Sequence, residues 1–218
     1  MKKLFRAALS AFMILALAGC GDGGSARPAI FTSILSDPAF DGDIQKDPAS
    51  GAFTVTQGNT QSMFAGINPT SGVEFRAFLD FPLTGANGVP GNAIIDSAFL
   101  DIVISSIVPQ PLRGTIPLRI DLVSFQPPNL VGNDFDRILQ PALASITVFP
   151  PISQADFGGH VTIDVTSLMV EAQRSGLLNF QVRIMEDLGI VTPGLIEIND
   201  TTGVNQNILA PELRVTYF

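Results

Sequence analysis

The chain has 218 residues but no tryptophan, one cysteine (Cys20), one histidine (His160) and one tyrosine (Tyr217). Because the only thiol lies near the N-terminus, disulfides, thiolate metal sites and cysteine nucleophiles are excluded from the rest of the chain. A zinc site made of histidine and cysteine is excluded as well. Sixteen phenylalanines take the place of the missing aromatics, and we expect most of them in the core because phenylalanine has no polar group.

Basic residues are also scarce. After the first 19 residues there are nine Lys and Arg against twenty Asp and Glu, a formal charge of −11. Such a surface repels phosphate backbones, so nucleic acid is not expected as a partner. The chain contains no Gly-x-Ser-x-Gly elbow, Walker loop or dinucleotide fingerprint. We therefore expect no catalytic residues and a non-catalytic protein, with a glycan hydrolase or lyase as the less favoured alternative.

The N-terminus has the pattern of a secretory signal. Three basic residues precede an apolar stretch from Ala7 to Leu17, which is too short to span a bilayer. The following Leu17-Ala18-Gly19-Cys20 resembles the lipobox of bacterial lipoproteins. This resemblance implies that residues 1–19 are a signal peptide and that Cys20 carries acyl chains such as palmitate. The alternative is an ordinary secretory leader with a chance cysteine.

Residues 20–29 are small and Gly-rich, which predicts a flexible tether between the lipid and the domain. Gly21 follows Cys20 where an Asp would favour retention at the inner membrane. We therefore expect a lipid-anchored protein of the cell envelope, with the outer membrane as the favoured location.

From residue 30 onward apolar and polar residues alternate with a period of two, which is typical of half-buried strands. In residues 73–81 all odd positions are apolar, and Phe78 is the apolar exception among the even ones. Further alternating segments cover residues 98–104, 118–122, 161–165, 178–184 and 213–217, and weaker ones cover 30–35, 53–57, 145–149 and 195–198.

Clusters of Gly, Pro and Asn separate these segments. One short helix is expected from Ser167 to about Ser175, with Thr166 or Ser167 as its cap and Gly176 as its stop. The pattern predicts an all-β, antiparallel, jelly-roll-like β-sandwich over residues 30–218. An outer-membrane barrel is disfavoured, because Thr216, Arg214 and Glu212 are polar in phase with Phe218.

The order of several short motifs resembles the DNRLRE-type domain, which is related to carbohydrate-binding module family 96. The motifs are Asp41-Gly42-Asp43-Ile44, Arg76 with Phe78-Leu79-Asp80-Phe81, Ser97-Ala98-Phe99-Leu100, Ile163-Asp164-Val165-Thr166, Gly176-Leu177-Leu178-Asn179-Phe180 and Ala210-Pro211-Glu212-Leu213-Arg214-Val215-Thr216-Tyr217. The resemblance implies a jelly-roll-like sandwich and polysaccharide binding. The chain departs from the family in lacking its tryptophans.

Sugar binding in sandwich modules usually depends on planar aromatic side chains that stack on the sugar ring. Tyr217 is in phase with the core residues Leu213 and Val215. Phe78 and Phe99 are out of phase with their apolar neighbours and are the candidates for stacking. The alternative is that they are buried under a loop or a second sheet.

Acidic loops suggest calcium as the one cofactor to consider, because calcium prefers oxygen ligands. Asp41 and Asp43, with Gly42 between them, are the first candidates, and Asp37 and Asp47 lie nearby. Glu186-Asp187 and Asn199-Asp200 are further candidate edge sites. The alternative for each is a solvated acidic turn. His160 is interpreted either as a general base or metal ligand or as an exposed residue at the start of a strand.

The first functional hypothesis is recognition of a polysaccharide by an anchored domain. The second is a structural or accessory role, in which the lipoprotein binds another envelope protein through a sheet face or edge.

Overall fold

The computed structural model describes residues 28–109, 114–125, 129–187 and 193–218. The predicted signal peptide, Cys20 and almost all of the predicted tether lie outside these residues. The described residues form twelve strands: β1 Ile30–Leu35, β2 Gly42–Lys46, β3 Phe53–Gln57, β4 Ser62–Ile67, β5 Glu74–Pro82, β6 Ile95–Pro109, β7 Leu118–Val123, β8 Ala144–Thr147, β9 His160–Asp164, β10 Asn179–Glu186, β11 Gly194–Asn199 and β12 Glu212–Tyr217. The helices are α2 Thr166–Arg174 and α3 Gln206–Leu209, with 3-10 turns η1 Gly132–Phe135 and η2 Gln154–Asp156.

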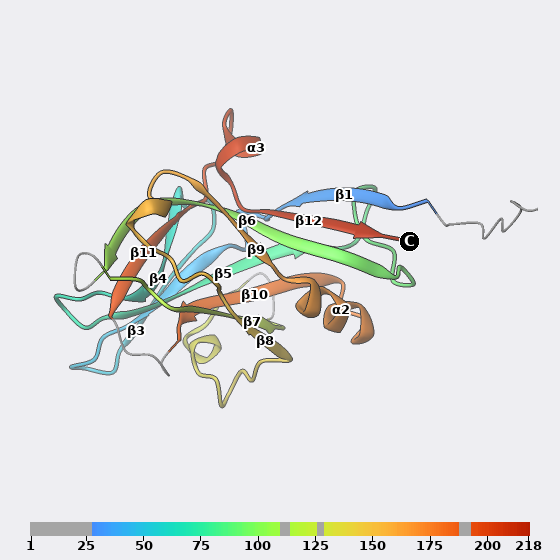
Figure 1. Cartoon of the computed structure of the whole chain (residues 1–218). Helices are drawn as coiled ribbons and strands as arrows, with labels where there is room; N and C mark the ends of the chain where they lie inside the picture. The colour runs from blue at the N-terminus through green and yellow to red at the C-terminus, as the bar shows by residue number, and fades with distance from the viewer. Residues whose placement is uncertain (1–27, 110–113, 126–128, 188–192) are drawn as a thin grey trace, which may run out of the picture.

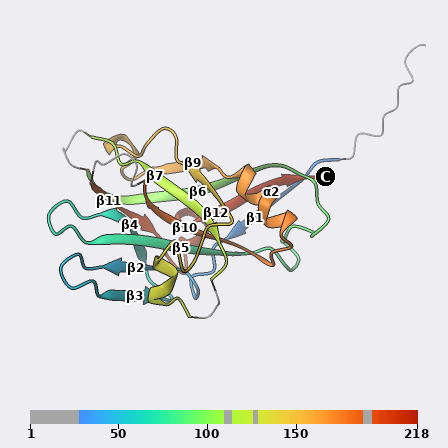
Figure 2. The same cartoon turned by 90° about the horizontal axis from the view of Figure 1, so that it is seen from below.

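The strands form one curled antiparallel sheet whose two parts face each other (Figures 1 and 2). The first layer is β1, β12, the beginning of β6, and β9. The second layer contains β11, β4, β5, β10, β7 and β8, and the β2–β3 hairpin pairs with β5. The all-β antiparallel sandwich predicted from the sequence is confirmed.

Strand β6 joins the two layers. Its first half pairs with β12 and β9, while Ile104 and the residues that follow pair with β11. The register shifts between Ile104 and Ser106, opposite Ile198 and Glu197. A bulge of this kind bends a strand and increases its twist, so β6 can pass from one layer to the other.

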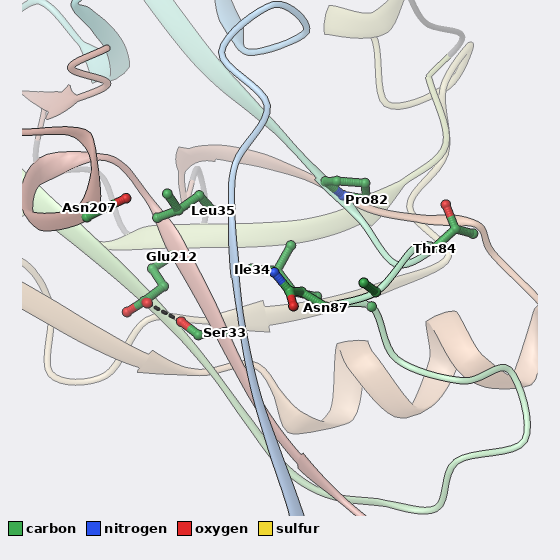
Figure 3. A pocket seen from close by; sticks show the side chains of 10 residues that line it. Ser33, Ile34, Leu35, Pro82, Thr84, Asn87, Asn207 and Glu212 are labelled. Atoms are coloured by element: carbon green, nitrogen blue, oxygen red, sulfur yellow. Dashed lines mark hydrogen bonds between the residues drawn. The ribbon is translucent and has the colours of Figure 1, made fainter. Parts of the chain in front are cut away.

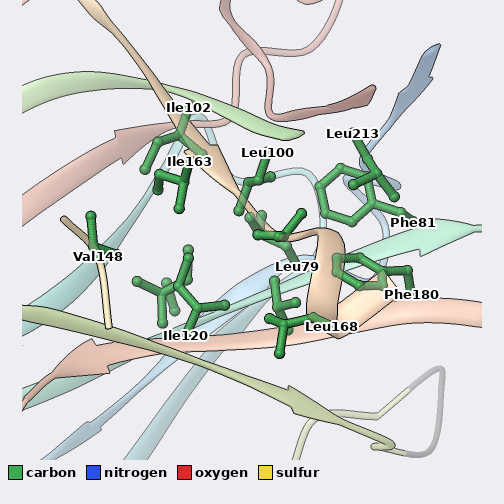
Figure 4. Close-up of a cluster of buried hydrophobic side chains, with 14 of the residues drawn as sticks. Leu79, Phe81, Leu100, Ile102, Ile120, Val148, Ile163, Leu168, Phe180 and Leu213 are labelled. Atoms are coloured by element: carbon green, nitrogen blue, oxygen red, sulfur yellow. The ribbon is translucent and has the colours of Figure 1, made fainter. Parts of the chain in front are cut away.

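The core between the layers is apolar, as the alternating pattern requires. Leu100 and Ile102 of the first layer face Leu79, Ile120 and Phe180 of the second (Figure 4), and all five are completely buried. The predicted core position of Tyr217 is also confirmed, because its exposure is only 7%.

Helix α2 covers the core at the end of the molecule where the chain's C-terminus lies (Figure 1). Leu168, Met169 and Ala172 are buried in the core. The helix exists where it was predicted, but its predicted cap is wrong. Val165 is the N-cap, and the Thr166 hydroxyl bonds to the backbone of Ala98 on β6 instead. Helix α3, a single turn, was not predicted.

Strand β5 is buried on both faces, which corrects the prediction of a half-buried strand. Phe78 lies in a second, smaller apolar cluster with Ile44, Val123, Phe125, Leu130 and Phe135. The connection from β7 to β8 contributes Leu130 and Phe135 and covers this face of the second layer. The alternating sequence pattern could not predict that this connection covers β5, because the pattern shows which face of a strand is apolar and not what packs on the polar face.

Candidate functional site

The outer face of the first layer carries one aromatic ring among polar side chains. On β6, Ala98 and Leu100 are completely buried in the core, so Phe99 between them points outward. Its exposed fraction is 38%. Asp101, two residues further, faces the same way because side chains on a strand alternate.

The strand register surrounds Phe99 with polar groups. Arg214 of β12 and Asp164 of β9 lie directly opposite Phe99, and Ser33 of β1 lies opposite Arg214. Side chains of directly opposite residues are neighbours on one face. With the adjacent row and with His160 in the row beyond it, they form a surface that we name the open face: Ser33, Phe99, Asp101, His160, Thr162, Asp164, Glu212 and Arg214.

The carboxylate of Asp101 is the centre of the polar network on the open face. It accepts hydrogen bonds from the Thr162 hydroxyl at 3.1 Å and from the Arg214 guanidinium, and the His160 Nδ1 lies 2.6 Å from it. Arg214 Nε is 3.6 Å from Glu212, and Glu212 accepts a hydrogen bond from the Ser33 hydroxyl. These contacts fix the side chains before any ligand arrives.

Two grooves hollow the molecule beside this network. The larger, about 540 Å³, lies between β1 and the loop that follows β5, and Figure 3 shows Ser33 and Glu212 joined at its wall. The smaller, about 270 Å³, lies at Asp101, His160 and Arg214. Asn207 and Glu212 line both grooves. The two depressions therefore adjoin each other along β12.

The open face presents donors and acceptors for a hydroxyl-rich ligand. Arg214, His160 and Ser33 carry donor groups, and Asp101 and Glu212 carry acceptors. The pKa of Asp164 is lowered by hydrogen bonds from Thr166, so a carboxylate lies opposite Phe99 at neutral pH. Polar groups in fixed positions around an apolar surface are what ligand sites use for orientation.

Of the two predicted stacking residues, only Phe99 is accessible. The prediction for Phe78 is wrong, because its side chain has no exposed surface. Its ring packs edge-on against Phe125 at a centroid distance of 5.7 Å and an angle of 87°. Phe78 and Phe99 both break the alternation of their strands. They differ because the connection from β7 to β8 covers Phe78 and leaves Phe99 accessible.

Sequence reasoning did not identify Arg214, Glu212 or Asp101 as site residues. Each was recognised only as the polar partner in an alternating strand. Their grouping depends on the register of β12 against β6, and no local pattern states which strands pair. His160 is exposed at the start of β9, and its ring nitrogen contacts Asp101.

The predicted calcium candidates Asp41 and Asp43 have different partners. Asp43 accepts a hydrogen bond from the Phe64 amide at 3.1 Å, and burial raises its pKa to about 6. Asp41 instead lies beside Asp200, which follows β11. Both Asp41 and Asp200 are completely buried.

Burial raises the pKa of Asp41 well above its usual value, and repulsion from Asp200 raises it further. Burial also raises the pKa of Asp200 to about 7. One oxygen of Asp41 accepts a hydrogen bond from the backbone amide of Asp80 at 2.7 Å. Within the described residues, no three His, Cys, Asp or Glu side chains are grouped so that they could hold a metal ion by themselves.

The other acidic candidates differ from this pair. Asp47 is exposed and accepts hydrogen bonds from the backbone amides of Ala49 and Ser50. It therefore forms a solvated acidic turn, the alternative to a calcium site in the sequence analysis. Glu186 is buried, and burial raises its pKa to about 7. The neighbouring Asp187 accepts the Thr147 hydroxyl at 3.1 Å.

None of the described helices is long and apolar enough to cross a bilayer. No known protein-family model matches the chain, and no curated protein matches its sequence. The resemblance to the DNRLRE-type domain therefore stays a prediction.

Proposed function

We propose that this protein is a non-catalytic, lipid-anchored β-sandwich of the bacterial cell envelope that binds a polysaccharide on its open face. The observation that carries this proposal is Phe99. Its ring is 38% exposed on a strand whose flanking side chains are completely buried, and it stands among hydrogen-bonding groups that are already fixed.

Several features support the same proposal. A row of outward side chains on adjacent strands suits an extended polymer, and the two adjoining grooves along β12 extend the contact surface. The sequence resemblance to a polysaccharide-binding family agrees with this ligand class. The anchor is supported by the lipobox-like Leu17-Ala18-Gly19-Cys20 and by the short Gly-rich segment before β1.

The ion pairs on the open face favour a role in ligand binding over a role in catalysis. Asp101 already contacts Arg214, Thr162 and His160, so its carboxylate holds these donors in place and keeps lone-pair capacity for a ligand hydroxyl. The side chains fit a surface that orients hydroxyl groups.

The test is binding of the protein to a panel of cell-wall and extracellular polysaccharides, with Phe99→Ala as the decisive variant. We expect about tenfold weaker binding, because a lost stacking contact contributes about 1–1.5 kcal/mol. Phe99→Tyr should retain affinity, since it keeps the ring. The matched control is Phe149→Ala, whose ring is 90% exposed and lies after β8 in the second layer.

Binding that survives in Phe99→Ala, or weakens equally in Phe149→Ala, would contradict the use of the open face. Failure of the parent protein to bind any polysaccharide would contradict the proposed function. A protein partner, the second hypothesis from the sequence, would then be the function to pursue.

A further inference from the structure

We propose that the oxygens of Ser36, Asp41, Thr60 and Asp200 form a calcium site. The four residues come from three connections of the fold. Ser36 and Asp41 lie between β1 and β2, Thr60 lies between β3 and β4, and Asp200 follows β11. None of them belongs to the open face, so this site is independent of the proposed polysaccharide surface.

Backbone hydrogen bonds tie the three connections together. The amide of Gly58 donates to the Asp41 carbonyl at 3.1 Å, and the amide of Asn59 donates to the Pro38 carbonyl at 2.6 Å. The amide of Asp200 donates to the Gln61 carbonyl at 3.0 Å. The side chains are therefore held near one another by the backbone, whatever their own interactions are.

The oxygens at this point are buried and have no partner. Ser36 lies beside Asp41, and Thr60 lies beside Asp200. Yet the Ser36 and Thr60 hydroxyls, one oxygen of Asp41 and both oxygens of Asp200 have no partner at the distance and angle of a normal hydrogen bond. Ser36 is only close enough to Asp41, and Thr60 and Asp41 to Asp200, to oppose the rise in the pKa of each carboxyl. Asp200 has no exposed surface, and Ser36 has 2%. Buried polar oxygens without a partner are costly, so three carboxylate and two hydroxyl oxygens in one place point to a ligand that pairs them.

The charge of the cluster indicates that the ligand is a cation. Asp37 and Asp80 add to the negative potential at this pair. Asp80 is itself bonded by the side-chain amides of Asn179 and Gln181. No Lys, Arg or His among the described residues forms an ion pair with any of the four aspartates.

The ligand chemistry favours calcium among the divalent cations. The cluster offers only oxygen, from two carboxylates and two hydroxyls, and this excludes sites that need nitrogen or sulfur. Calcium accepts irregular sets of six to eight oxygens that include neutral ligands, whereas magnesium demands regular octahedral geometry. Two carboxylates also balance the charge of one such ion.

The experiment is thermal melting of the full chain in detergent, refolded in excess calcium chloride or in excess EGTA, together with calorimetric titration of calcium into the EGTA-treated protein. At calcium roughly a hundredfold above its dissociation constant we expect a melting temperature about 5–10 °C higher. Asp200→Asn should abolish this rise and should melt above the parent in EGTA, because it removes the repulsion. Asp96→Asn, at an exposed acid on β6, should behave as the parent.

A parent that melts at one temperature in calcium and EGTA, with no heat of calcium binding, would overturn the proposal. So would a calcium-dependent rise that persists in Asp200→Asn, or an equal rise with magnesium. Should Asp200→Asn fail to fold, Ser36→Ala provides the second variant, with weaker calcium binding expected. A melting temperature that responds to pH but not to calcium would identify a proton shared by the two carboxylates, and this too would overturn the proposal.

Discussion

The side chain of Arg183 has no exposed surface, and its guanidinium lies 2.8 Å from the equally buried carboxylate of Asp121. The same guanidinium donates to the carbonyls of Asp134 and Gln140, which belong to the connection that covers this face of the second layer. Asp121 also contacts Arg119 at 2.6 Å and accepts the Ser145 hydroxyl. This ion pair therefore fixes a loop as well as balancing a charge.

Asp121→Asn keeps the size of the side chain and removes its charge. We expect a loss of about 3–5 kcal/mol in the free energy of unfolding, because a buried guanidinium is left without its counter-charge. Chemical denaturation measures this directly. The comparison is Glu171→Gln, which removes an ion pair with the exposed Arg174 and should change stability little. Equal effects of the two substitutions would contradict the role given to Asp121.

The sequence placed Arg183 on the polar side of an alternating strand, as a residue facing solvent would be. Its burial depends on a connection that returns over the sheet from β7. Arg183 and Phe78 were misjudged for one reason, because alternation distinguishes the two faces of a strand but not one cover from another. Phe99 lies on a face that no connection among the described residues covers in this way.

Two strands, β2 and β4, were not predicted from the sequence. β4 contains Gly66, which normally weakens a strand, and β2 contains the buried Asp43. At Gly66 the backbone has a φ of 111°, and a Cβ would lie 2.1 Å from the carbonyl oxygen of Gly194 on β11. The glycine therefore permits a close approach of β4 to β11, which a propensity argument interprets as a defect.

Gly66→Ala should cost about 2–4 kcal/mol in unfolding free energy, since the new methyl group meets backbone on the neighbouring strand and the left-handed φ is strained. Thermal or chemical unfolding provides the measurement. Gly91→Ala is the matched control, because no atom lies within 4 Å of its added Cβ. If Gly66→Ala unfolded at the same temperature or denaturant concentration as the parent, β4 and β11 would be able to move apart without loss of stability, which would contradict this prediction.

Across the whole molecule, buried carboxylates make stability depend on pH. Burial raises the pKa of Glu186 and of Asp200 to about 7, and that of Asp43 to about 6. Burial alone would raise the pKa of Asp121 too, but hydrogen bonds from Ser145, Arg119 and Arg183 lower it. The ion-pair network thus stays charged over the range in which the other carboxylates titrate.

A raised pKa means that the native state holds a proton which the unfolded chain has already released. Stability from these groups is therefore full below about pH 4 and is lost as pH rises toward 7, by about 1.4 kcal/mol per pH unit for each proton. We expect the melting temperature in EGTA to fall between about pH 4.5 and 7.5. Glu186→Gln should reduce the slope, and a melting temperature that rises over this range would contradict the assignment.

The sequence alone determined the fold class, most strands and the position of the helix, because each depends on local periodicity and on nearby breakers such as Gly176. It also limited the side chains available for binding, since the chain has no tryptophan and only one cysteine, one histidine and one tyrosine.

Only the tertiary structure decided which polar residues meet. Asp41 pairs with Asp200 and not with Asp43, which is two positions away, and Phe99 is open while Phe78 is covered. Strand register and the path of long connections set these outcomes. Both are fixed by contacts between residues distant in sequence, which a pattern of neighbours does not contain.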